Sequence, residues 1–586
     1  MHGSDGARPH PRTRVAAAAP DLLTAGVSVV IALVVLGPAL LASGSVLRGD
    51  MVFVPHQPWK DAWLGLDGSV PRAVPMDALV SLATKVVPGG WLQKILLLSS
   101  FVVAGTGIGR LVRRVVGGSS WAAVAAVAAY LWNPWVVERL SIGQWATVVG
   151  YALLPWVVLA AWRVRDDATR WPMLLVTLVL SAVCSPSSGL TAALVALAVV
   201  VTRWRAVLVV VASVGVANAP WLVPGLTLGD RVDLGGAAGF ASFGARAESS
   251  LGVLPSVLSL GGIWKESVVP AERTSALVVA AALLLSVVAV LALLRARVDR
   301  GLKRSLLATG GLAVALAVVP AWAPDGLADI SRVVPGLSIL RDSHRYLAPL
   351  ALVLSLGVAL VVVALRRRAA AGQEGLLVPT LALLAAPALL LPSAAWGLAG
   401  DLRPVTYPAE WDTVSAILAE DDAAGSGDTI VLPWVGSYRR LGWNDSRASL
   451  DPAPRLLPGE VLIDDRIVLP DRVLPGEDPR AAQVTGALEE ADAAQALHDV
   501  GVRWVLVEKP VPRAYDAPPG TVVHDGRWLT LVDLGPAAQV DDPRAGGAGR
   551  RAVILAADAV AVVGLFVAIV TFARRRGYAP PGRTGE

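Results

Sequence analysis

Runs of about 20 residues without a charged side chain recur along this chain and constrain its fold more than any other feature. Examples are the segments 22–41, 276–294 and 347–365. A helix of this length crosses the hydrocarbon core of a bilayer. Hydrophobic residues make up 55% of the 586 residues, charged residues make up 17%, and the mean hydropathy is +0.60. The sequence therefore predicts an all-α polytopic membrane protein.

The apolar segments predict about twelve transmembrane helices, eleven of them in a membrane domain over 21–398 and the last over 552–573. The predicted spans are 21–44, 92–112, 119–134, 144–163, 171–186, 188–202, 205–224, 274–295, 304–323, 345–365, 376–398 and 552–573.

Arginine clusters alternate with long uncharged or acidic loops between these spans. Short basic loops remain in the cytoplasm, so the clusters predict the orientation of every span. The N-terminal tail 1–20 and the C-terminal tail 574–586 are then both cytoplasmic, at the plasma membrane. The clusters are Arg110, Arg113 and Arg114; Arg163, Arg165 and Arg170; Arg203 and Arg205; Arg295, Arg297, Arg300, Lys303 and Arg304; Arg366, Arg367 and Arg368; and Arg574, Arg575 and Arg576.

The net charge and the cysteine content exclude several classes of function. A formal charge of +5 is small for so long a chain, and the arginines lie at span ends, so we expect no nucleic-acid partner. Cys184 is the only cysteine, which excludes a disulfide within the chain and a cysteine-based metal site.

The segment 399–551 differs in composition from the rest of the chain and is predicted to form an extracytoplasmic α/β domain before the last helix. It is rich in acidic residues. Strand-like runs lie at 429–434, 502–508, 521–524 and 528–532, and helical patterns lie at 410–420 and 481–500. Strands mixed with helices are typical of an α/β module.

The first group of candidate site residues follows the first span. Asp50 begins the first outer loop, 45–91, where a carboxylate can meet a lipid-borne substrate and take a proton from an acceptor hydroxyl. His56 lies six residues further and is a candidate for substrate binding. The alternative interpretation is that Asp50 caps a turn and His56 is an interfacial residue.

The second group lies between the third and fourth predicted spans, where Glu138, Arg139 and Gln144 stand among tryptophans. Ionisable residues close to spans are costly unless they are paired or functional. Arg139 is a candidate for binding phosphate and Gln144 for hydrogen bonding to a sugar hydroxyl. The tryptophans are interpreted first as interface anchors.

The third group is Arg341, Asp342, His344 and Arg345, at the outer mouth of a span. A guanidinium stays charged and bonds phosphate through two parallel hydrogen bonds, so both arginines suit a phosphate leaving group. They also break the positive-inside pattern. The alternative is an arginine–aspartate pair that holds the helix end.

Together these segments resemble the GT-C superfamily of polytopic glycosyltransferases, and most closely the actinobacterial cell-envelope enzymes of the arabinofuranosyltransferase and mannosyltransferase type. The resemblance implies that Asp50 is the catalytic base. The family often has a second acidic residue directly after the first, where this chain has Met51, so a second carboxylate must come from elsewhere, such as Asp61 or Asp77. The segments that carry the resemblance are Gly49-Asp50, 133–139, Gly143-Gln144-Trp145, 260–264 and Leu340-Arg341-Asp342.

The resemblance implies transfer of a sugar from a polyprenyl-phosphate donor, such as decaprenyl-phospho-arabinose or -mannose, to a cell-envelope glycan or glycolipid on the outer face of the membrane. The expected partners are membrane lipids, the lipid-linked donor and the glycan acceptor. No cofactor or metal is required, because arginines can neutralise a monophosphate. Two alternatives are left open. One is a transporter of lipid-linked saccharides, for which charged residues deep in the spans and inverted repeats are typical. The other is a non-catalytic envelope assembly protein.

Overall fold

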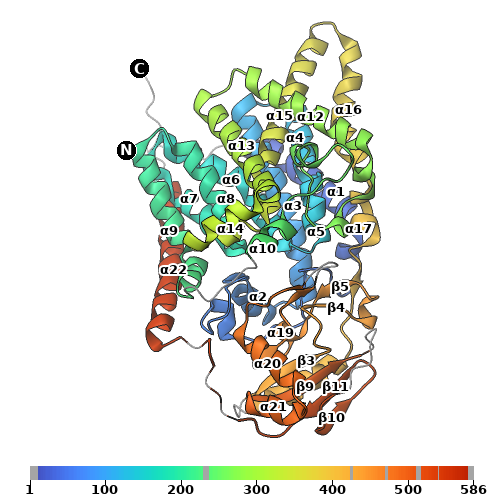
Figure 1. Ribbon diagram of the computed structural model, residues 1–586. Coiled ribbons are helices and arrows are strands. Elements are labelled where there is room, and N and C mark those ends of the chain that lie inside the picture. The colour runs from blue at the N-terminus through green and yellow to red at the C-terminus, as the bar shows by residue number, and fades with distance from the viewer. Residues whose placement is uncertain are drawn as a thin grey trace.

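The computed structural model describes residues 11–228, 236–334, 336–422, 427–468, 473–509, 517–538, 540, 542–544 and 546–577. The predicted tails 1–20 and 574–586 lie partly outside these residues. The described chain forms a large bundle of helices with a smaller mixed sheet at one end (Figure 1).

Eight helices in the described ranges are long and apolar enough to cross a membrane, so the polytopic architecture is confirmed. A ninth span is possible if two consecutive helical segments, Leu377–Leu390 and Pro392–Gly400, count as one span bent by 68°. The eight helices are α1 (Pro11–Leu41), α3 (Gly89–Val116), α6 (Trp145–Asp166), α9 (Trp204–Leu226), α12 (Ala276–Arg295), α13 (Arg300–Trp322), α15 (Ala348–Ala370) and α22 (Ala548–Gly577).

The predicted number of twelve spans is not reached by these criteria. Three predicted spans, 119–134, 171–186 and 188–202, are shorter apolar helices: α4 (Ser120–Leu131), α7 (Trp171–Cys184) and α8 (Pro186–Val200). Ser185 ends α7 and caps α8 by accepting a hydrogen bond from the Ser188 backbone, which separates the two helices. The bent segment contains α16 (Leu377–Leu390) and α17 (Ala395–Gly400). The remaining short helices are α2 (Met76–Thr84), α5 (Pro134–Ser141), α10 (Gly236–Phe243), α11 (Val253–Leu258) and α14 (Pro324–Val333).

Small residues allow the first helices to pack closely. A Cβ atom on Gly105 of α3 would lie 1.8 Å from Ser28 Oγ of α1, and one on Gly109 would lie 2.6 Å from Thr24. Membrane helices favour such contacts because close packing, rather than release of water, stabilises them.

Several of the predicted cytoplasmic arginine clusters lie at one end of the bundle, where ion pairs join them. Arg110 at the end of α3 pairs with Asp21 at the start of α1 at 2.7 Å, and Arg165 at the end of α6 pairs with Asp299 before α13 at 2.9 Å. The sheet lies at the opposite end of the molecule from the α15–α16 connection (Figure 1). This arrangement agrees with the predicted topology, while the cytoplasmic placement of the clustered end stays a prediction.

The segment between α17 and α22 contains a five-stranded sheet with the order β10-β11-β9-β3-β6. Strand β3 runs parallel to both of its neighbours, β9 and β6, whereas β11 is antiparallel to β9 and to β10. The strands are β3 (Asp428–Leu432), β6 (Val461–Leu462), β9 (Val502–Glu508), β10 (Thr521–Asp525) and β11 (Leu529–Asp533). All four predicted strand-like runs therefore coincide with strands of this sheet.

Side chains alternate between the two faces of the sheet and form two separate cores. On one face, Val431 and Leu506 pack with Trp411 of α18 (Glu410–Asp422). On the other face, Ile430 and Val505 pack with α20 (Pro479–Glu489) and α21 (Ala493–Asp499). We refer to residues 401–547 as the outer domain, after the side of the membrane predicted for it.

The helical pattern predicted over 481–500 corresponds to two helices, α20 and α21. They are separate because Asp492 caps the second by accepting a hydrogen bond from the Gln495 backbone at 3.2 Å. An aspartate at this position favours a new helix start over continuation of the preceding helix.

The first outer loop, which follows α1 of the bundle, also contributes residues to the outer domain. Its strand β1 (Ser45–Val46) pairs antiparallel with β2 (Pro404–Val405), at the start of the outer domain. Leu47, Val52 and Val54 are buried in the same core as Trp411. The outer domain is therefore packed against the first outer loop and not merely linked through the chain.

Candidate functional site

Two glycines bring the first outer loop into backbone contact with the loop after α5. Gly49 has φ +55°, and a Cβ atom there would lie 2.0 Å from Ile142 O; Gly143 has φ +87°, and its Cβ would lie 2.2 Å from Arg48 O. Only glycine permits both the backbone conformation and this approach. The Asp50 backbone N–H donates to Ile142 O at 2.9 Å. The residues after the two glycines, Asp50 and Gln144, consequently lie side by side.

The carboxylate of Asp50 accepts hydrogen bonds from two neutral side chains. Gln144 Nε2 donates to Asp50 Oδ2 at 3.2 Å, and the Tyr438 hydroxyl of the outer domain donates to Asp50 Oδ1. The same Gln144 amide donates to Asp342 Oδ2 at 3.3 Å. Gln144 therefore joins two carboxylates that are 292 positions apart in the sequence.

The second carboxylate beside Asp50 is Asp342, which corrects the expectation of Asp61 or Asp77. Asp61 pairs with Arg551 at 2.6 Å and Asp77 with Arg455 at 2.9 Å, so both are engaged elsewhere. The Met51 side chain is fully buried in the hydrophobic core of the bundle. An acidic residue at that position would place a charge in this core.

Asp342 is held between two arginines. Arg139 donates to its two oxygens at 3.0 and 3.2 Å, and Arg345 Nε donates at 2.7 Å. Burial raises the pKa of Asp342, but the charges of Arg139 and Arg345 outweigh it and hold the pKa well below its usual range. The two arginines thus favour the charged form of Asp342.

Arg139 does not present a free guanidinium to a substrate. Its side chain is 0% exposed, and besides Asp342 it contacts Gln144 and His344 Nδ1, the latter at 2.6 Å. These contacts suit a residue that orients Asp342 and Gln144, in place of the phosphate-binding role predicted for it.

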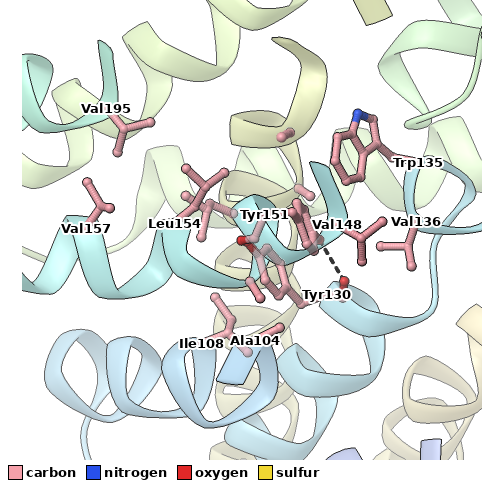
Figure 2. Packing of buried hydrophobic residues seen from close by; sticks show 14 of the residues in the cluster. Ala104, Ile108, Tyr130, Trp135, Val136, Val148, Tyr151, Leu154, Val157 and Val195 are labelled. Atoms are coloured by element: carbon pink, nitrogen blue, oxygen red, sulfur yellow. Dashed lines mark hydrogen bonds between the residues drawn. The ribbon is translucent and has the colours of Figure 1, made fainter. Parts of the chain in front are cut away.

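Aromatic packing between α4, α5 and α6 supports the segment that carries Asp342. The rings of Tyr130 and Tyr151 stack at 4.2 Å, and Trp135 stacks on Tyr151 at 4.8 Å (Figure 2). Trp135 Nε1 donates to the carbonyl of His344 at 3.0 Å. Trp135 is therefore a buried support for the segment that carries Asp342, not an interface anchor.

Glu138 and His344 lie in a buried polar network on the far side of Arg139. His344 Nε2 lies 3.5 Å from Glu138 Oε2, and Glu248 pairs with Arg273 and accepts the Gly262 N–H at 2.8 Å. Burial, and then the neighbouring Glu248, raises the pKa of Glu138 well above its usual value. The raised pKa favours the neutral form of Glu138, which lies beside this network.

Arg345 lines a pocket among the membrane helices. The pocket is small and partly open to the surroundings. The Arg345 side chain is 33% exposed, more than that of Asp342 at 11%. The other lining residues come from α5, α6, α8 and α15 and are rich in hydroxyl groups: Trp135, Thr147, Gly150, Tyr151, Leu154, Ser187, Ser188, Thr191 and Ala348.

Arg341 and His56 are placed differently from the rest of the predicted group. The Arg341 guanidinium lies 4.8 Å from the Phe243 ring and 3.5 Å from Glu477 of the outer domain. His56 Nδ1 is within hydrogen-bonding distance, 3.0 Å, of the Thr84 carbonyl at the end of α2. Arg341 therefore lies at the contact with the outer domain, and His56 is not brought to the carboxylates.

Two residues of the site were not selected from the sequence as site residues. Tyr438 contacts Asp50, and Lys265 Nζ lies 5.1 Å from the centre of the Tyr438 ring. Burial raises the pKa of Tyr438 and lowers that of Lys265. No local signal marks Tyr438, because its partner is 388 positions away.

Within the described residues, no group of three or more histidine, cysteine, aspartate or glutamate side chains is arranged to hold a metal ion. What the arrangement offers is a carboxylate with neutral partners, Asp50, beside a partly exposed arginine, Arg345. A carboxylate of this kind can accept a proton, and an arginine can stabilise a phosphate.

No family model and no curated protein sequence matches this chain. Among solved structures, the fold matches a cryo-EM structure of a variant of arabinofuranosyltransferase AftD from Mycobacteria, with a TM-score of 0.50 and 16% sequence identity. The match covers 92% of this chain and 42% of that one. The chain thus spans less than half the length of the structure it resembles. The resemblance to the arabinofuranosyltransferase type, predicted from the sequence, is confirmed at the level of the fold.

Proposed function

We propose that this protein is a membrane glycosyltransferase that moves a sugar from a polyprenyl-phosphate donor to a cell-envelope glycan or glycolipid on the outer face of the plasma membrane. The observation that carries the proposal is the junction of Asp50, Gln144, Asp342 and Arg345, where the bundle meets the outer domain. A related fold in a protein described as an arabinofuranosyltransferase supports it.

Asp50 is the proposed general base. Each oxygen of a carboxylate carries two lone pairs, so Asp50 retains acceptor capacity beyond its bonds to Gln144 and Tyr438. It takes the proton of the acceptor hydroxyl as that oxygen attacks the anomeric carbon of the donor sugar. Because both of its partners are neutral, protonation of Asp50 breaks no ion pair.

Arg345 is the proposed contact for the departing lipid phosphate. The bond from the sugar to the phosphate breaks as the new bond forms, and negative charge accumulates on the phosphate oxygens. A positioned guanidinium stabilises this charge, and such electrostatic stabilisation often supplies the largest share of rate enhancement. The hydroxyl groups that line the pocket beside Arg345 offer hydrogen-bond partners for the sugar or phosphate of the donor.

The outer domain is proposed to position the acceptor. Donor and enzyme share the plane of the membrane, which raises their effective concentration. The acceptor then has to approach from the side of the outer domain, whose hairpin reaches Asp50 through Tyr438.

The decisive experiment is transfer from radiolabelled polyprenyl-phospho-arabinose or -mannose by the full-length protein in lipid vesicles. Asp50→Asn keeps the shape of the side chain and removes the base, so we expect the rate to fall about 100-fold or more. Asp61→Asn is the matched control, because this aspartate lies in the same loop but pairs with Arg551 at the surface. Equal rates for the two variants contradict the assignment of Asp50.

The alternative is an envelope assembly protein that binds the saccharide without turnover. It rests on the absence of a second acidic residue directly after Asp50, where Met51 stands. Donor binding by the wild type, with no transfer to any acceptor in a broad panel, favours this alternative.

A further inference from the structure

A hairpin of the outer domain forms part of the wall around Asp50. It consists of β4 (Tyr438–Arg440) and β5 (Ala448–Leu450), which pair antiparallel. The Gly49 N–H donates to Ala448 O at 2.9 Å, and the Leu450 N–H donates to Gly49 O at 2.8 Å. The loop that carries Asp50 therefore pairs with the edge of the hairpin through a single parallel bridge between Gly49 and Ser449.

The hairpin is anchored to the sheet through the residue next to Tyr438. Arg439 is buried and pairs with Asp451 at 3.1 Å and with Glu508 of β9 at 3.0 Å. Successive side chains of a strand point to opposite sides. Because Arg439 is held inward by two carboxylates, Tyr438 is directed outward, toward Asp50.

Tyr438 meets Asp50 through its hydroxyl while its ring rests beside Lys265. The hydroxyl donates to Asp50 Oδ1, on the opposite oxygen from Gln144. The Lys265 ammonium lies 5.1 Å from the ring centre, within the range of a cation–π contact. A tyrosine has only two side-chain torsions before its hydroxyl, so these contacts leave it little freedom.

We propose that Tyr438 is a positioning residue, whose hydroxyl holds the Asp50 carboxylate in one orientation so that the outer domain completes the catalytic site. The inference rests on the proposed function, since it concerns the base of that reaction. With donors on both oxygens, the plane of the carboxylate is set by the bundle through Gln144 and by the outer domain through Tyr438. A general base must stand within hydrogen-bonding distance of the proton it takes, so the orientation of this plane governs the rate.

The test compares Tyr438→Phe with Tyr407→Phe in the full-length protein, using the transfer assay above. Tyr407 lies in the same domain, and its buried hydroxyl has no hydrogen-bond partner among the described residues, so its loss leaves Asp50 unaffected. We expect Tyr438→Phe to lower kcat about tenfold, with KM for the lipid donor unchanged within about twofold and the same thermal unfolding midpoint. Tyr407→Phe is expected to match the wild type.

A kcat for Tyr438→Phe within about twofold of the wild type overturns the inference and leaves the proposed function standing, provided that Asp50→Asn is inactive in the same assay. A raised kcat overturns it as well, because it shows that the hydroxyl obstructs the acceptor. A wild type that transfers no sugar overturns the proposed function and the inference together.

Discussion

The two carboxylates that share Gln144 are held in opposite ways. Asp342, at the outer mouth of α15, lies between Arg139 and Arg345, and its side chain is 11% exposed. Asp50, in the first outer loop, is bound by an amide and a phenol, both neutral, at the contact with the outer domain. The bundle side of the site is therefore built from buried ion pairs, and the outer side from neutral hydrogen bonds.

This difference suits a structural role for Asp342 and the proposed catalytic role for Asp50. Removing one partner of a buried ion pair leaves an uncompensated charge, whereas removing a neutral hydrogen bond has a smaller effect. Asp342 thus maintains the arrangement of Arg139, His344 and Gln144, whereas a proton added to Asp50 breaks no ion pair. Substitutions on the two sides are expected to separate stability from activity.

The largest expected effect follows from Asp342→Asn. This change removes the charge that compensates the fully buried Arg139, so we expect the free energy of unfolding to fall by about 3 kcal/mol or more. Asp50→Asn, which breaks no ion pair, is expected to change it by less than about 1 kcal/mol. Thermal or denaturant unfolding of both variants in the same detergent measures the difference. Similar losses in the two variants contradict the division between the two sides of the site.

A smaller effect is expected at Arg345 and Arg341, which were both predicted from the sequence to bind phosphate. Arg345→Lys keeps the charge but loses the planar guanidinium, so kcat/KM for the lipid donor is expected to fall about tenfold. Arg341→Lys serves as its matched comparison and is expected to stay within about twofold, because Arg341 contacts Phe243 of α10 and Glu477 of the outer domain. If Arg341→Lys causes the larger loss, the phosphate lies at the outer domain and not beside the pocket.

Sequence patterns predicted the elements of this fold well. Apolar runs and arginine clusters gave the helices of the bundle, since a bilayer imposes both signals along a continuous stretch of chain. The strands β3, β9, β10 and β11 were likewise found from short β-branched runs. The count of twelve spans is not confirmed, because α4, α7 and α8 are too short to pass the same length test and their apolar composition does not reveal where each helix ends.

Individual residues of the site could be predicted from the sequence, but their arrangement could not. Local charge near predicted spans selected Asp50, Arg139, Asp342 and Arg345, which the structure brings together. Their pairing, and the entry of Tyr438, depend on how distant loops fold over one another. Met51 shows the same limit, because the neighbouring carboxylate is supplied from position 342 and not from a nearby residue.

The smallest expected effect concerns Lys60, which joins the first outer loop to the outer domain by donating to Pro454 O at 2.8 Å. Burial disfavours its ammonium and lowers its pKa from the ordinary 10.5 to about 8. Between pH 8 and 10.5 the unfolded chain therefore binds a proton that the folded protein has released. Stability then rises with pH across this window, because the penalty for burying the charge, fully present below the folded pKa, is progressively removed.

Thermal unfolding of the wild type and Lys60→Met at pH 8 and 9 isolates this contribution. We expect the wild type to gain about 1 kcal/mol relative to Lys60→Met as the pH rises, since the methionine does not titrate. A parallel response of the two proteins shows that the Lys60 ammonium is not buried at the contact between the first outer loop and the outer domain. A gain confined to the wild type shows that this contact persists in the membrane, as the role of Tyr438 at Asp50 requires.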